Sequence, residues 1–293
     1  MIKHITRRRF ITTSALCAAA IYTGCSNREK SEKKKFLIRY DTESRQREEM
    51  KGFFEKIVSV QRSYDIPLSF FCLGAAIDKR KSEFIEFAGE VKGDPLFDFQ
   101  CHSYSHIGLG YTKGKSVEVL KADFEKAFAV HEGVFGSRPI GVSICGTGGV
   151  DGPSECGFDA TEKSRAELDM LANLGVKMVN TNLCRKDSTT EFVNYAKIGH
   201  PGIMGFPNGT PSDNGWLRGR KYGEPKEFIT KHIEKNAKNN NHMAIMFHDD
   251  TGWIDVNDKE MDNLKLVVDV ARKNGYNVVS HFDCYQNKKL WKS

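Results

Sequence analysis

The sequence predicts an α/β fold built on a parallel sheet, because two kinds of segment alternate along it. Short apolar runs typical of strands are separated by longer runs whose apolar residues have helical spacing. Strands that alternate with helices lie parallel, with the helices outside, in either a barrel or an open doubly wound sheet. Seven or eight strand–helix units favour the barrel, and one barrel accommodates the 293 residues.

The predicted elements follow one another in order and leave two long irregular stretches. Strands are expected at 36–41, 67–73, 97–101, 140–145, 176–181, 203–206, 243–247 and 277–280. Helices are expected near 45–63, 79–91, 116–134, 161–174, 225–240 and 258–274. In the third helix Leu120, Phe124 and Ala127 are spaced to form one buried stripe. The irregular stretches, 145–160 and 182–224, are expected to be loops that shape a site.

Residues 1–24 have the organisation of an export signal. A basic segment, Lys3–Arg9, precedes a short apolar segment, Phe10–Tyr22, which is too short to span a membrane. The segment Thr6–Ile11, with three arginines in a row, resembles a twin-arginine (Tat) signal. A signal anchor that stays uncleaved is the alternative interpretation.

The cysteine that follows this segment predicts a lipid anchor. Small residues before Cys25 resemble the cleavage site of a bacterial lipoprotein, in which the cysteine becomes the lipidated first residue. Residues 25–35 are then a charged tether, and residues 36–293 form a single barrel domain. We therefore expect an exported protein of the bacterial cell envelope that contacts the membrane only through its lipid.

The basic character of the chain is confined to its first residues. The net charge is +6, but residues 1–35 contain nine of the 44 basic residues and only two of the 38 acidic residues. The other 258 residues therefore carry a net charge of −1. This balance argues against nucleic acid as a partner.

The cysteines give no metal or redox motif of their own. Eight are present, and none forms a C-x-x-C pair, which argues against a zinc ribbon or a thioredoxin-type site. The six that follow the tether are interpreted as buried thiols or disulfides, and their pairing cannot be deduced from the sequence.

Chemically reactive side chains follow three of the predicted strands, where a parallel barrel builds its active site. Asp41 and Glu43 end the first strand, His102 and His106 follow the third, and His248 ends the seventh. The two histidines are four residues apart, so a helical turn would place both rings on one side. Two imidazoles and a carboxylate form a common ligand set for a divalent metal. The structural alternatives are a helix cap for Asp41, a first-turn helix acid for Glu43 and satisfied buried histidines.

These motifs resemble those of the polysaccharide deacetylase family of metal-dependent carbohydrate esterases. The segment His102–His106, H-S-Y-S-H, is similar to the family's second motif, and Asp41–Glu43 is similar to the first. Phe247–His248 resembles the last motif, and Pro211–Trp216 resembles the fourth. The resemblance covers about residues 36–285 in order. It implies a single distorted (β/α) barrel of seven or eight parallel strands, which removes acetyl groups from a polysaccharide or oligosaccharide, with N-acetyl amino sugars as the expected substrates.

The resemblance also implies a division of labour among these residues. Asp41 would be the catalytic base, and Glu43, His102 and His106 would bind the metal, although Asp41 and Glu43 could exchange these roles. The expected metal is zinc, with cobalt or nickel as alternatives. His248 would be the catalytic acid.

Further residues are expected around this centre. The resemblance gives Asp213 the role of orienting the catalytic histidine. Tyr104 and Trp216 are candidates for stacking on sugar rings of a glycan substrate. The glycine-rich loop that begins at Gly146 is expected to let the backbone approach that glycan.

One departure from the family concerns the partner of the catalytic base. The third motif normally supplies an arginine that steadies this carboxylate, whereas the equivalent stretch here offers Ser143. Arg39, two residues before Asp41 on the same strand face, could take its place. Two alternatives therefore stay open: a metal-containing glycan-binding lipoprotein without catalytic activity, and an esterase for O-acetyl groups of the xylan type.

Overall fold

The computed structural model describes residues 34–44, 50–109, 115–145, 162–181, 192–208, 211–239 and 242–290. The predicted export signal, Cys25 and Gly146 lie outside these ranges. None of the described helices is both long and apolar enough to cross a membrane.

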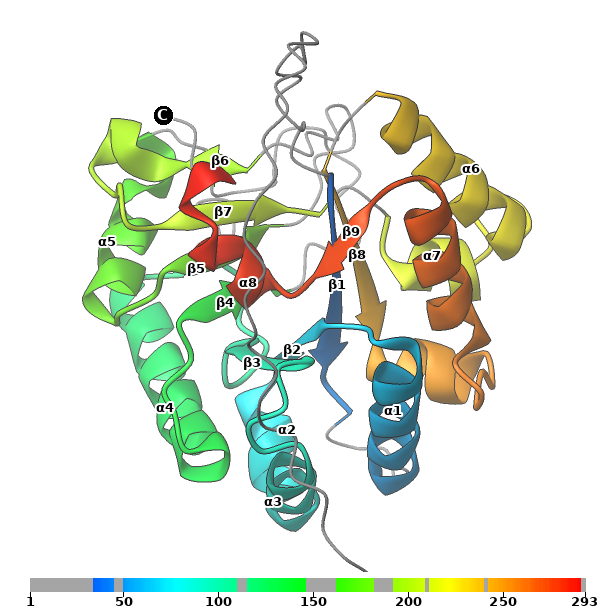
Figure 1. The fold of residues 1–293 in the computed structure, drawn as a ribbon. Coiled ribbons are helices and arrows are strands. Elements are labelled where there is room, and N and C mark those ends of the chain that lie inside the picture. The colour runs from blue at the N-terminus through cyan, green and yellow to red at the C-terminus, as the bar shows by residue number, and fades with distance from the viewer. Residues whose placement is uncertain are drawn as a thin grey trace, which may run out of the picture. The chain divides into compact units, whose positions relative to one another are not determined.

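The predicted α/β fold with parallel strands is confirmed (Figure 1). The strands are β1 (Lys35–Thr42), β2 (Leu68–Cys72), β3 (Phe97–Cys101), β4 (Gly141–Ser143), β5 (Met178–Thr181), β6 (Val193–Asn194), β7 (Met204–Pro207), β8 (Met243–His248) and β9 (Asn277–Val279). They form one curled sheet in the order β6-β7-β5-β4-β3-β2-β1-β8, and β9 also pairs with β1. Only the two-residue β6, which the sequence did not predict, runs antiparallel.

Most of the described helices lie around the outside of this sheet, and the last one in the chain packs on its inner face (Figure 1). The helices are α1 (Met50–Tyr64), α2 (Gly74–Lys79), α3 (Lys81–Glu90), α4 (Val117–Phe135), α5 (Arg165–Asn173), α6 (Pro225–Lys238), α7 (Asp262–Lys273) and α8 (His281–Gln286). The helix expected near 79–91 is observed as α3, whereas the short helices α2 and α8 were not predicted. The longest, α4, begins where the Ser116 side chain accepts a hydrogen bond from Val119 N and ends at left-handed Gly136.

Strand β1 shows how the two faces of the sheet differ. All eight of its residues are buried. Phe36 and Ile38 belong to the core between sheet and helices, whereas Leu37 belongs to a smaller core on the inner face, with Cys284 of α8. Since side chains alternate along a strand, Arg39 and Asp41 follow Leu37 on the inner face. The inner face is therefore apolar near the start of β1 and polar near its end.

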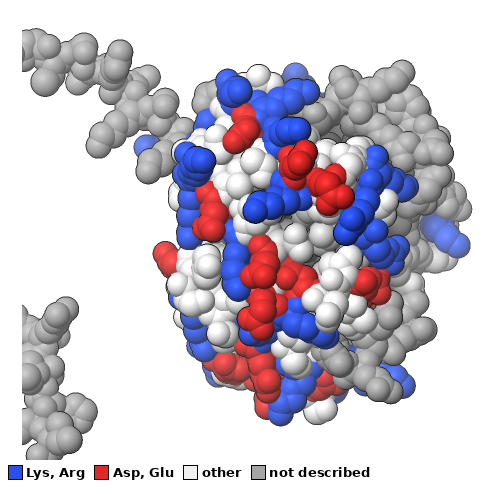
Figure 2. All heavy atoms as spheres, turned by 90° about the vertical axis from the view of Figure 1, so that its right-hand side faces the viewer, with Lys and Arg blue, Asp and Glu red and all other residues white. Residues whose placement is uncertain are grey.

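The described surface carries charges of both signs. On the face in Figure 2, basic and acidic side chains are interspersed. Some are paired: Lys56 Nζ lies 2.9 Å from Glu260 Oε2, and Arg218 Nη1 lies 2.9 Å from Asp255 Oδ2.

We predict that buried His131 makes stability depend on pH. The side chain is 1% exposed, and burial lowers its pKa from 6.5 to about 4. Between these values the unfolded chain binds the proton and the folded chain does not, so stability falls as the pH falls from 6.5 toward 4. Relative to His131→Leu, the wild-type protein should lose about 2–3 kcal/mol of unfolding free energy between pH 7 and pH 4.5. Denaturant unfolding at both pH values measures this, and parallel losses in the two proteins would contradict it.

Candidate metal and catalytic site

The reactive residues predicted from strand ends meet at the carboxyl edge of the sheet. Asp41 lies opposite His248 in the register of β1 and β8. Glu43 follows β1 directly, and His102 follows β3 directly. The ends of three strands thereby place two carboxylates and three imidazoles, including that of His106, around one point.

Glu43 joins the two histidines that were predicted to bind metal. Its Oε1 lies 2.9 Å from His102 Nε2 and 3.2 Å from His106 Nε2. His102 is buried, whereas Glu43 and His106 are 24% and 33% exposed, so the cluster is accessible from one side. Burial raises the pKa of Glu43, but the hydrogen bonds of His102 and His106 outweigh it and hold the pKa well below its usual range. The group is thus an ionised carboxylate between two imidazoles.

The backbone of Glu43 is held by an acidic residue that follows β8, the neighbour of β1 in the sheet. Asp249, directly after β8, accepts hydrogen bonds from Glu43 N at 3.1 Å and from Ser44 N at 3.3 Å. Its carboxylate is 1% exposed. This bridge between the ends of β1 and β8 turns the chain so that Glu43 points toward the histidines.

A loop, and not the predicted helical turn, brings His102 and His106 together. Ser103 and His106 adopt left-handed backbone conformations, with φ of 60° and 64°. Asp123 of α4 holds the loop by accepting hydrogen bonds from Tyr104 N at 2.7 Å and Ser105 N at 3.1 Å. Left-handed backbone conformations are costly for residues other than glycine and concentrate at functional sites. The four-residue spacing of His102 and His106 therefore belongs to a constrained loop.

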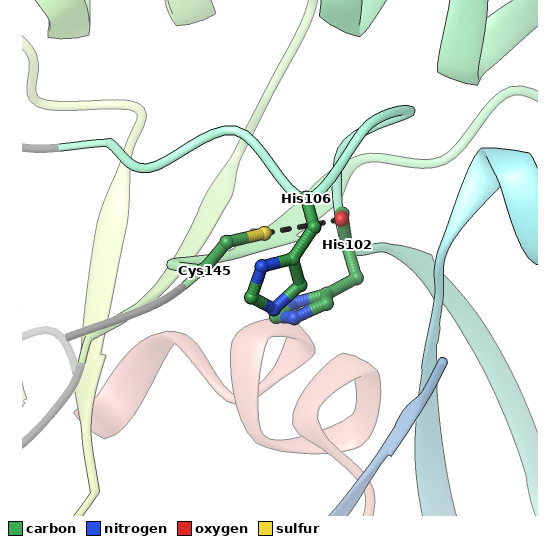
Figure 3. A group of neighbouring side chains, drawn as sticks. All are labelled: His102, His106 and Cys145. Atoms are coloured by element: carbon green, nitrogen blue, oxygen red, sulfur yellow. Dashed lines mark hydrogen bonds between the residues drawn. The ribbon is translucent and has the colours of Figure 1, made fainter. Parts of the chain in front are cut away.

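Cys145 is a further neighbour that the sequence did not single out. It follows β4 closely, and its thiol donates to the His102 carbonyl oxygen at 3.2 Å (Figure 3). His102, His106 and Cys145 offer ligand atoms that all lie within 4.8 Å of one another, as do Asp41, Glu43 and His102. The sequence feature that could have identified Cys145 was its position at the end of a predicted strand.

The carboxylate predicted to be the base has a cationic partner. Arg39 Nη2 lies 3.0 Å from Asp41 Oδ2, and the two side chains are 1% and 2% exposed. The expectation that Arg39 faces Asp41 is confirmed. Ser143, at the position of the family's arginine, instead hydrogen-bonds His102 Nδ1. Asp41 Oδ1 is buried without a hydrogen-bond partner among the described residues and lies 3.9 Å from His102 Nδ1.

His248 is fixed by Asp213, as the resemblance implied. The Asp213 carboxylate lies 2.6 Å from His248 Nδ1 and accepts the His248 backbone N–H at 2.7 Å. The other ring nitrogen, Nε2, lies 3.8 Å from Glu43 Oε1. Burial lowers the pKa of His248, but Asp213 outweighs it, and the pKa rises to about 10. The ring therefore presents an N–H group to the cluster.

The residues expected to stack on sugars are placed differently. Trp216 is fully buried and packs against Phe247 at a ring distance of 6.0 Å, so its proposed role on a sugar ring is wrong. It lies three residues after Asp213, whose attachment to His248 carries this segment into the core. Tyr104 is half-buried, with Lys126 Nζ 3.6 Å from its ring centroid. A sugar on that ring face would have to displace the ammonium group.

Comparisons of sequence find no match, either among protein-family models or among curated proteins. Solved structures do match. A proposed polysaccharide deacetylase from Mycobacterium smegmatis has a TM-score of 0.62 at 11% identity, covering 88% of this chain and 92% of that one. A family 4 acetyl xylan esterase from Clostridium thermocellum, in complex with a cobalt ion, has a TM-score of 0.50 at 11% identity, covering 87% and 92%. A CE4 family pseudoenzyme from Bacillus anthracis has a TM-score of 0.50 at 11% identity, covering 86% and 66%. At these identities the similarity shows a shared fold.

Proposed function

We propose that this protein is a metal-dependent hydrolase that removes acetyl groups from a polysaccharide or oligosaccharide, with N-acetyl amino sugars as the preferred substrates. One observation carries the proposal: Glu43, His102 and His106 converge beside a buried Asp41 and an Asp213-held His248. The fold shared with the deacetylase of Mycobacterium smegmatis supports it.

The donor set suits a divalent metal. A carboxylate and two imidazoles, contacting one another at 2.9 and 3.2 Å, are ligands that zinc prefers, and the accessible side leaves room for water and substrate. Glu43, His102 and His106 would hold the ion, zinc being the first expectation and cobalt or nickel the alternatives. A bound ion of this kind polarises a carbonyl oxygen and lowers the pKa of water.

The proton transfers fall to two residues of the chain. Asp41 would accept the proton of the attacking water at Oδ1, the oxygen that has no other partner among the described residues. Arg39 donates a hydrogen bond to the other oxygen, Oδ2, and thereby holds the carboxylate in place. His248 would donate from Nε2 to the departing amine or alkoxide, while Asp213 fixes its other nitrogen. The products are acetate and the deacetylated sugar.

The alternatives differ in what they require of these residues. The Bacillus anthracis pseudoenzyme has a similar fold, so the fold is compatible with a glycan-binding protein without catalytic activity. The buried Arg39–Asp41 pair favours an enzyme, because it gives the proposed base a cationic partner at the site. An O-acetyl esterase would use the same groups on a different leaving atom. The export signal, the lipid on Cys25 and the cell-envelope location stay predictions from the sequence.

The test is acetate release by the full-length protein. The protein is stripped of metal with a chelator, given zinc or cobalt, and incubated with an N-acetylglucosamine oligomer or with acetylated xylan. We expect acetate only after metal is restored, and more from the oligomer. More acetate from xylan would indicate the esterase. No acetate from either substrate, with one metal bound per chain, would indicate the binding protein, and chelator-insensitive release would contradict the proposal.

A further inference from the structure

We propose that Asn180 and His281 are positioning residues that act on the base Asp41 through Arg39. The inference rests on the proposed function and extends it, because it makes the C-terminal helix α8 part of the catalytic apparatus. Neither residue belongs to the strand-end motifs from which the site was predicted.

A continuous chain of hydrogen bonds crosses the inner face of the sheet. Arg39 of β1 donates from Nη2 to Asp41 at 3.0 Å and from Nη1 to Asn180 Oδ1 of β5. Asn180 Nδ2 lies 2.6 Å from His281 Nε2. The side chains of Arg39, Asn180 and His281 are at most 1% exposed, so water does not compete for these bonds.

The chemistry of the donors fixes the direction of this chain. A guanidinium group only donates, so Asn180 must present its oxygen to Arg39 and its amide N–H to His281. His281 Nε2 must then accept, which requires a neutral ring protonated at Nδ1. Burial, with the added charge of Arg39, lowers the pKa of His281 to about 3, which keeps the ring neutral. Arg39 and Asn180 therefore each have one orientation that suits this chain, while Nδ1 of His281 is buried without a hydrogen-bond partner among the described residues.

Helix α8 places the far end of the chain rigidly. His281 N donates to Ser69 Oγ of β2 at 2.9 Å. The centroid of its ring lies 5.4 Å from that of Phe71, in an edge-on arrangement, and 5.3 Å from that of Phe206, in a tilted one. The imidazole that holds Asn180 is thus fixed in place by contacts of its own backbone and ring.

Asn180 controls the orientation of the guanidinium plane. Asp41 lies two residues from Arg39 on the same strand, and Nη2 also lies 2.8 Å from the sulfur of Met246, a weak acceptor, so both of these contacts hold the same end of the guanidinium. The bond from Nη1 to Asn180 fixes its opposite side and thereby aims Nη2 at Asp41 Oδ2. This leaves Asp41 Oδ1 directed at the cluster, where the base is needed.

Full-length variants test the chain through kcat, KM and bound metal. Asn180→Leu should lower kcat about 10- to 100-fold, as for other residues that orient a catalytic group, with KM and metal content within about twofold of wild type. His281→Phe should lower kcat about 10-fold, whereas His281→Gln, whose amide oxygen can accept from Asn180, should restore most of it. Met178→Leu is the matched control, because Met178 is buried on the same strand and inner face, and should leave kcat within about twofold of wild type.

A second comparison separates positioning from general damage to the fold. In the Arg39→Met background, Asn180→Leu should cause no further loss of kcat, because its effect passes through Arg39. An equal loss in both backgrounds, or equal losses for His281→Gln and His281→Phe, would overturn the inference. Full activity of Asn180→Leu would overturn it and leave the proposed function standing. A wild-type protein that releases no acetate would overturn the proposed function itself, and the inference with it.

Discussion

Replacement of His106 by alanine should remove the metal and, with it, the activity. His106 is one of three proposed ligands, and Glu43 and His102 alone would bind a divalent ion weakly. Metal content should fall from one ion per chain to a small fraction, and acetate release should fall about 10³-fold or more, since a metal contributes several kcal/mol to such reactions. Elemental analysis of dialysed protein and an acetate assay measure both. His106 is suited to this test because it is 33% exposed, so the fold tolerates its removal.

A histidine outside the site provides the control. His232 of α6 is half-buried and stacks on Phe228 at 5.5 Å. His232→Ala should keep one metal ion per chain and wild-type acetate release. If His106→Ala retains its metal and its activity, these ligands are wrongly assigned.

Asp41→Asn should abolish most activity while the metal stays bound. The amide has nearly the shape of the carboxylate but accepts no proton, so kcat should fall about 10²- to 10⁴-fold. Metal content should stay at one ion per chain, because Glu43, His102 and His106 are unchanged. Loss of the metal would instead show that Asp41 is a ligand and that Glu43 is the base.

The same variant should also be less stable. Arg39 and Asp41 are both nearly fully buried, and removing one partner of such a pair costs about 3–5 kcal/mol because the other charge stays buried. Thermal unfolding of wild type and Asp41→Asn measures this loss. An unchanged melting temperature would contradict the description of Asp41 as the buried partner of Arg39.

The fold was predictable where local pattern and packing agree. The strands that carry the site are short runs rich in apolar residues because they are largely buried, as β1 shows, in which all eight residues are buried. Three short elements escaped prediction: β6 has two residues, and α2 and α8 have six each, too few for a periodic pattern.

The site was predictable as far as it depends on strand ends. Asp41, His102 and His248 meet because parallel strands bring their carboxyl ends to one edge. The turn between His102 and His106 was wrongly expected to be helical, because a spacing of four residues suits a helical turn but also fits this loop with two left-handed residues.

Side chains placed by long-range packing were not predictable. Trp216 was expected in a sugar site because Pro211–Trp216 resembles the fourth deacetylase motif, but the bond from Asp213 to His248 buries it. The contact of Asn180 with His281 joins residues 101 positions apart. It depends on how α8 docks on the inner face of the sheet, which no local pattern encodes.

The central claim is that Glu43, His102 and His106 hold a divalent metal beside Asp41. Diffraction from zinc-loaded crystals of the full-length protein, collected on both sides of the zinc absorption edge, tests it directly. We predict one anomalous peak within bonding distance of the Glu43 carboxylate and of both imidazoles. The absence of a peak at this position, or a peak bound through Cys145 and not Glu43, would contradict the claim.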